Sequence, residues 1–155
     1  MDTLRPQDFV EYRLVRLAEQ LERRFSAAVG AGGLSARQFS VLAVLAAEPG
    51  ITSADLARAV LTRPQSMHAL LDQLQARGLV DRGAQRGRGR AAPVRLTAAG
   101  RAVLSTSVAR VVALDAQTRA GLGEADHREL VRLLDRVEEV VGLAQGDSRP
   151  SSTRR

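Results

Sequence analysis

The sequence predicts a mainly α-helical fold with one small β-hairpin set between helices. Apolar residues recur at intervals of three and four through most of the 155 residues, which is the period of an amphipathic helix. Hydroxyl side chains that can cap a helix stand just before four of these segments. Only around residues 79–96 does the pattern change, to short apolar runs separated by glycines. The length fits one domain or two small lobes.

The first helix is predicted from Pro6 to about Val29, where a group of glycines ends the pattern. Its apolar residues, spaced by three and four, are Phe9, Tyr12, Leu14, Leu17, Leu21, Phe25 and Val29.

Three shorter helices are predicted next, over residues 35–48, 52–59 and 62–77, joined by turns of a few residues. Each is expected to begin at a capping pair spaced by three: Ser35 with Gln38, Thr52 with Asp55, and Thr62 with Gln65. Gly78 stops the third helix. Capped helices this close together are typical of a helix-turn-helix unit.

The third of these helices has two unlike faces. One stripe is apolar and is predicted to lie in the core: Met67, Leu70, Leu71 and Leu74. The opposite face is small and polar and suits insertion into a groove: Gln65, Ser66, His68, Ala69 and Asp72.

A basic hairpin is predicted to follow. Leu79 and Val80 form a short strand and Pro93–Leu96 a second, and between them glycine alternates with arginine. Two strands joined by such a loop make a wing, so the segment 34–97 is predicted to be a winged helix-turn-helix core.

Two long helices complete the chain. Thr97 is expected to cap a helix from Ala98 to about Ala120, and a last helix runs from about Glu124 to Leu143. We expect residues 1–33 and 98–144 to form flanking dimerisation helices and residues 145–155 a disordered tail.

Charge is unevenly distributed along the chain. All 23 basic residues are arginine, and the net charge is +6. Residues 58–101 contain nine arginines and two acids, so this segment alone carries +7. An asymmetry of this kind favours an anionic polymer as partner, here double-stranded DNA.

A helix that fits the major groove, beside cations that neutralise phosphates, is what DNA recognition requires. The helix from Thr62 supplies the first, and the arginines of the loop supply the second, since arginine is favoured in a narrow minor groove. The candidate DNA-binding residues are Thr52, Thr62, Arg63, Gln65, Ser66, His68, Arg86, Arg88 and Arg90.

Four segments, in this order and spacing, resemble the MarR family of winged-helix regulators: Leu34–Leu42, Leu56–Ala57, Leu74–Val80 and Leu96–Arg101. The resemblance implies a homodimer in which the first and the last two helices interleave. It also implies a repressor on a pseudo-palindromic operator, released by a small aromatic or phenolic molecule. The chain departs from the family at Arg88–Arg90, where an Asp-Arg-Arg stretch is common and Arg-Gly-Arg stands instead.

Because family pockets lie between the dimerisation layer and the DNA-reading lobe, Tyr12, Arg16 and Phe39 are candidate effector-binding residues. In the alternative interpretation, Tyr12 and Phe39 fill the core and Arg16 pairs with Glu19, Glu22 or an acid of the partner subunit.

Other classes of protein fit the sequence less well. The absence of cysteine excludes disulfides and thiol switches, and the two histidines lie too far apart in the chain to indicate a metal site. No catalytic motif or cofactor motif occurs, so no enzyme is expected. A non-specific architectural DNA-binding protein and a module that docks on an acidic protein remain as alternatives. Without a membrane span or a signal peptide, a cytoplasmic location is expected.

Overall fold

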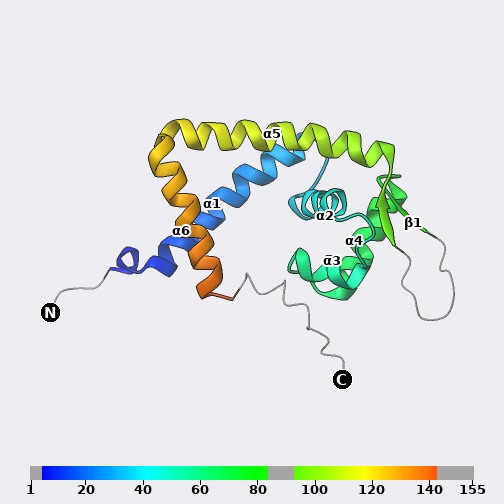
Figure 1. Cartoon of the computed structure of the whole chain (residues 1–155), viewed down its shortest axis with the longest axis horizontal. Helices are drawn as coiled ribbons and strands as arrows, with labels where there is room; N and C mark the ends of the chain where they lie inside the picture. Colours follow the sequence, from blue (N-terminus) through cyan, green and yellow to red (C-terminus); the bar gives the residue numbers. More distant parts are fainter. Residues whose placement is uncertain (1–4, 84–92, 143–155) are drawn as a thin grey trace, which may run out of the picture.

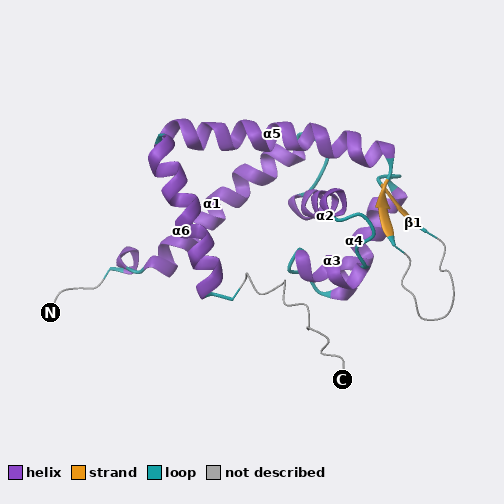
Figure 2. Ribbon diagram, viewed as in Figure 1, coloured by secondary structure: helices purple, strands orange, loops and turns teal. Residues whose placement is uncertain are grey.

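The computed structural model describes residues 5–83 and 93–142, and these form two helical layers joined by one long helix (Figure 1). Helices dominate, and one antiparallel hairpin interrupts them, as expected (Figure 2). The elements in chain order are the 3₁₀-helix η1 (Pro6–Asp8), α1 (Val10–Gly30), α2 (Ala36–Ala47), α3 (Ser53–Ala59), α4 (Pro64–Ala76), β1 (Val80–Arg82), β2 (Val94–Leu96), α5 (Ala98–Leu122) and α6 (Glu124–Val140).

The core lies in the lobe formed by α2, α3, α4, the hairpin and the start of α5. The apolar residues of α4 lie in this core as predicted: Met67, Leu71 and Leu74 are buried, and Leu70 is half-buried against them. The remaining buried members are Leu34, Val41, Leu42, Leu45, Leu56, Ala57, Leu79, Val80, Val94 and Leu104. One shared core therefore fixes the orientation of α4 relative to α2, α3 and the hairpin.

The second layer consists of α1, α5 and α6. Helix α5 extends from the lobe to the far end of the molecule, where the chain turns at Gly123, with φ +81°, into α6 (Figure 1). Helix α5 packs against both α1 and α6. Apolar side chains of α1 and α6 nevertheless stay exposed in the single chain: Val10, Tyr12, Val15, Leu17 and Leu21, and Leu130, Val131, Leu133, Leu134 and Val140.

Three of the four predicted helix caps are confirmed. Ser35 and Gln38 form a reciprocal capping box, with Ser35 Oγ accepting from the Gln38 N–H at 3.2 Å. Thr52 accepts from the N–H of residue 55 at 3.1 Å, and Thr97 accepts from that of residue 100 at 3.0 Å. Each satisfies a backbone donor that the first turn of a helix leaves free.

The predicted cap at Thr62 is wrong. Helix α4 begins at Pro64, and Arg63 is its N-cap without a side-chain cap. Proline lacks an N–H and has a helical φ, so it favours the first helical position and holds the residue before it extended. Arg63 accordingly has φ −73° and ψ 146°.

Some element ends also differ from prediction. The first segment splits into η1 and α1 at Phe9, which has an extended backbone. Strand β1 lies slightly later than expected and pairs Val80 with Leu96 and Arg82 with Val94. Helix α6 ends at Val140, shortly before Gly142 with φ +77°, and the expected end at Leu143 and the predicted tail lie outside the described residues.

Two glycines allow close contacts between elements. At Gly100, an added Cβ would overlap the carbonyl oxygen of Leu79 and lie 3.0 Å from its carbonyl carbon. At Gly32, it would overlap the hydroxyl of Ser107, a fully buried α5 side chain without a hydrogen-bond partner.

None of the described helices has the length and the apolar stretch that a membrane crossing requires.

Candidate nucleic-acid interface

Helix α4 presents the polar face that the sequence predicted. Gln65, Ser66 and His68 are exposed and fall in its first two turns. Arg63 is exposed at the N-cap, so a cation stands at the same end of the helix. The structure therefore brings together four of the candidate DNA-binding residues along one exposed edge of the lobe.

His68 has one of its two ring nitrogens occupied within the helix. Its Nδ1 lies 2.7 Å from the carbonyl oxygen of Pro64, one turn earlier. The ring is thereby held against the helix while the side chain stays exposed.

The two candidate threonines lie differently. Thr52 begins α3, and its hydroxyl donates to Asp55 Oδ2 at 2.6 Å while accepting from the N–H of the same residue. The hydroxyl hydrogen of Thr52 is therefore already donated to the Asp55 carboxylate. Thr62 is half-buried in the turn before α4, and its N–H donates to the Ala57 carbonyl at 2.9 Å.

Asp55 is stabilised as an anion at this position. The hydrogen bond from the Thr52 hydroxyl, together with the nearby Arg58 guanidinium, lowers the pKa of the Asp55 carboxyl. Arg58 also forms an ion pair with it. The carboxylate therefore stays ionised at neutral pH, and its pair with Arg58 leaves no net positive charge at the start of α3 to attract a phosphate.

Arg82, in strand β1 at the base of the wing, connects the hairpin to α4, a contact that our sequence analysis missed. Its NH1 lies 2.9 Å from Asp72 Oδ1, and its NH2 donates to the His68 carbonyl at 3.0 Å. The side chain is only 26% exposed, so these contacts are partly shielded from water. Asp72 is the one acidic residue in the sequence of α4, but no spacing in the sequence links it to Arg82.

Arg77 anchors the other end of α4. Its NH1 donates to Gln38 Oε1 at 3.0 Å, and its NH2 donates to the Gly33 carbonyl at 2.7 Å. The same Gln38 oxygen completes the capping box of α2. Two arginines therefore hold the middle and the C-terminal end of α4, and its N-terminal end presents the polar face.

The wing is described only at its base. Strands β1 and β2 pair in antiparallel register, and the Gly83 N–H donates to the Pro93 carbonyl at 3.4 Å. The candidate arginines Arg86, Arg88 and Arg90 lie outside the described residues.

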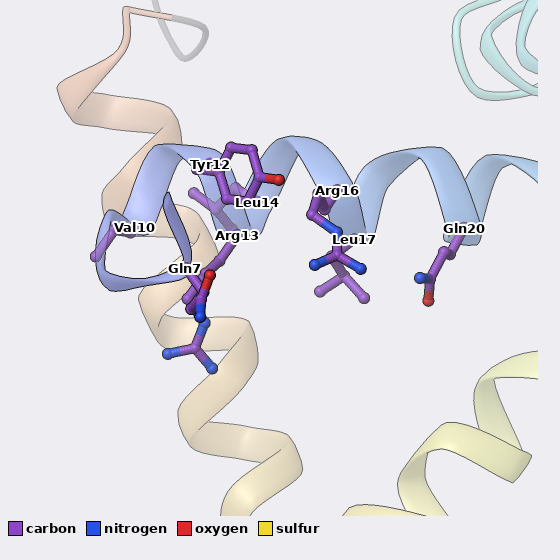
Figure 3. A pocket seen from close by; sticks show the side chains of 8 residues that line it. All are labelled: Gln7, Val10, Tyr12, Arg13, Leu14, Arg16, Leu17 and Gln20. Carbon is purple, nitrogen blue, oxygen red and sulfur yellow. The ribbon is translucent and has the colours of Figure 1, made fainter. Parts of the chain in front are cut away.

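Two of the three candidate effector-binding residues line one groove. Tyr12 and Arg16 share an open hollow of about 470 Å³ on α1 (Figure 3). Its other lining residues are Gln7, Val10, Arg13, Leu14, Leu17 and Gln20.

Phe39 does not line this groove. It packs edge-on against Phe25, with ring centroids 5.4 Å apart, and is half-buried beside the core, as the alternative interpretation expected. Tyr12 is 42% exposed in the single chain and does not fill the core. Among the described residues, Arg16 forms no ion pair with Glu19 or Glu22.

Across residues 5–83 and 93–142, no cluster of acidic and histidine side chains is arranged to hold a metal ion.

Three helices around one core, with an exposed third helix and a hairpin directly after it, define a winged helix-turn-helix protein. The MarR family model matches residues 32–91. The HTH-type transcriptional repressor Rv2887 of Mycobacterium tuberculosis is 38% identical over 126 residues, which span 81% of this chain and 91% of that protein. The chain therefore belongs to the MarR family, which is a family of transcriptional regulators.

Solved structures agree with this assignment. Rv2887 in complex with DNA superposes with a TM-score of 0.69 at 35% identity, covering 83% of this chain and 97% of that one. Rv2887 in complex with salicylic acid gives 0.67 at 36% identity, covering 88% and 98%. The transcriptional repressor CouR bound to a 23-mer DNA duplex gives 0.79 at 26% identity, covering 88% and 99%.

Proposed function

We propose that the protein is a homodimeric, sequence-specific transcriptional repressor that a small aromatic acid releases from its operator. The observation that carries this proposal is the exposed N-terminal half of α4, which has short polar side chains and is held by Arg77 and Arg82. Rv2887 and CouR, both named as transcriptional repressors and both solved with DNA, support the same function.

Base reading is assigned to the first two turns of α4. The N-terminal residues of a recognition helix usually reach base edges in the major groove. Gln65, Ser66 and His68 have the donors and acceptors for that contact. Phosphate contacts are assigned to Arg63, to Thr62 and to the wing arginines Arg86, Arg88 and Arg90. Thr52 is left out of this set, because its hydroxyl already donates to Asp55.

A second copy of the chain is the partner that we propose for the exposed apolar faces of α1 and α6. Large apolar side chains gathered on two helices mark an interaction surface in a protein of this size. A two-fold dimer would place two α4 helices on successive major grooves, roughly 34 Å apart, and would recognise a pseudo-palindromic operator. The protein would then act in the cytoplasm, on chromosomal DNA.

An aromatic acid suits the groove at Tyr12 and Arg16. A guanidinium binds a carboxylate in a planar, two-point geometry, and a tyrosine ring stacks on an aromatic ring. Salicylic acid in Rv2887 is an aromatic acid, and p-coumaroyl-CoA in CouR, at 27% identity, is a thioester with a phenolic ring. A ligand that binds better to the dimer whose α4 helices are wrongly spaced would lower operator affinity.

The test is fluorescence anisotropy of the full chain on DNA from upstream of its own gene, with a shuffled duplex as the control at about 0.15 M salt. A preference of roughly a hundredfold or more for the upstream duplex is expected of a specific regulator. Equal and steeply salt-dependent binding to both duplexes would favour an architectural protein instead. No binding to either would contradict DNA binding.

Two variants separate base reading from phosphate contact. Gln65→Ala should reduce the preference between duplexes, and Gln75→Ala, an exposed glutamine at the other end of α4, is its matched control. Arg90→Ala should weaken binding to both duplexes alike and flatten the salt dependence. An unchanged salt dependence in Arg90→Ala would contradict the role of the wing.

A further inference from the structure

The hydrogen bond of His68 determines which of its ring nitrogens carries a hydrogen. A backbone carbonyl oxygen can only accept, so Nδ1, at 2.7 Å from the Pro64 carbonyl, must be the donor. In the neutral imidazole the other nitrogen, Nε2, then has a free lone pair and no hydrogen. Since the side chain is exposed on the face of α4 proposed to meet DNA, this acceptor is available to a base edge.

We propose that His68 determines operator specificity by accepting a hydrogen bond at Nε2 from the exocyclic amine of an adenine or a cytosine. This inference rests on the proposed function and deepens it. In the major groove only the N6 amine of adenine and the N4 amine of cytosine donate. Guanine presents two acceptors to the groove and thymine one, so each would face the Nε2 lone pair without a hydrogen between them. The neutral ring therefore selects two of the four bases.

The surroundings hold this part of the helix in place. Arg82 donates to the His68 carbonyl at 3.0 Å and pairs with Asp72, one turn further along α4. The backbone at residue 68 is thus tied to strand β1, and the ring is tied to the carbonyl one turn earlier. A side chain restrained at both points loses less conformational freedom when it binds a base than a free one does.

The experiment selects duplexes from a random library with the full-length protein and sequences the bound fraction. We compare the wild type with His68→Ala and with the control Gln75→Ala at about pH 8. The wild type and the control should enrich adenine or cytosine over guanine by roughly fivefold at one position of each half-site. His68→Ala should lose that preference at this position alone.

The outcomes that overturn the inference are distinct. If His68→Ala enriches the same bases as the wild type at every position, His68 reads no base. If the position that relaxes in His68→Ala prefers guanine or thymine in the wild type at about pH 8, the assigned hydrogen is on the wrong nitrogen. If the wild type enriches no sequence at all, the proposed function fails, and the inference fails with it; this outcome is visible without any variant.

Discussion

The close approach of α5 to Leu79 predicts opposite effects for one substitution at two places in the same helix. Gly100 lies in the first turn of α5, where a methyl group would overlap the Leu79 carbonyl oxygen. Gly121 lies near the other end of α5, and a methyl group there would meet nothing within 4 Å. Neither glycine has a positive φ, so backbone strain does not separate them.

The magnitudes follow from the contacts. Alanine is favoured over glycine in a helix by up to about 1 kcal/mol, and this gain is available at both positions. Forcing an extra carbon into a packed site costs about 1–3 kcal/mol, and at Gly100 the upper end applies because the obstructing atoms are backbone. The Leu79 carbonyl also accepts from the Thr97 N–H at 3.1 Å, so moving it disturbs the start of α5 as well. We expect Gly100→Ala to lower the free energy of unfolding by about 2 kcal/mol.

The assay is urea unfolding followed by the helical circular dichroism signal, at one fixed protein concentration because dimer stability depends on concentration. Gly121→Ala should be as stable as the parent or up to about 1 kcal/mol more stable. In thermal melts Gly100→Ala should lower Tm by roughly 4–8 °C. If Gly100→Ala were as stable as Gly121→Ala, the packing of α5 on Leu79 described here would be refuted.

Three further predictions concern single side chains. Ser107→Ala should raise the free energy of unfolding by up to about 1 kcal/mol in the same assay, since it removes a buried hydroxyl without a partner. A marked decrease would mean that the hydroxyl forms a hydrogen bond. Arg82→Ala should lower the free energy of unfolding by about 1 kcal/mol, and adding Asp72→Asn should lower it little further, because the two residues share one interaction. Fully additive losses of the two substitutions in a double-mutant cycle would contradict the ion pair. The pKa of Asp55 is lowered by the Thr52 hydroxyl, so its carboxylate stabilises the fold above about pH 4, and this contribution is lost as pH falls through the lowered folded value. Asp55→Asn should therefore lose less stability than the parent between about pH 6 and about pH 3, as measured by urea unfolding, and equal losses would contradict the assignment.

Sequence patterns predicted the fold correctly where the interacting residues are close together in the chain. The caps at Ser35, Thr52 and Thr97 each depend on residues three apart, so the sequence contains the whole interaction. Thr62 shows the same spacing but is overridden by Pro64, whose fixed φ makes it the first helical residue. This correction was within reach of the sequence, since the proline stands two residues after the threonine.

The candidate site was harder to predict wherever two elements meet. The exposed face of α4 follows from helical period alone, and Gln65 and His68 are exposed as expected. The Arg82–Asp72 pair depends on how the hairpin packs against α4, which no spacing in the chain reveals. Phe39 likewise packs beside Phe25, away from the groove at Tyr12, because tertiary packing decides which face of α2 meets α1.

The groove on α1 also gives the protein an internal optical reporter. Tyr12 is the only tyrosine of the chain, and the chain contains no tryptophan. The intrinsic tyrosine emission of each subunit therefore originates from one side chain, and that side chain lines the groove. A molecule bound there can be followed by quenching of this emission without any attached dye, and a variant lacking Tyr12 is the spectroscopically silent reference.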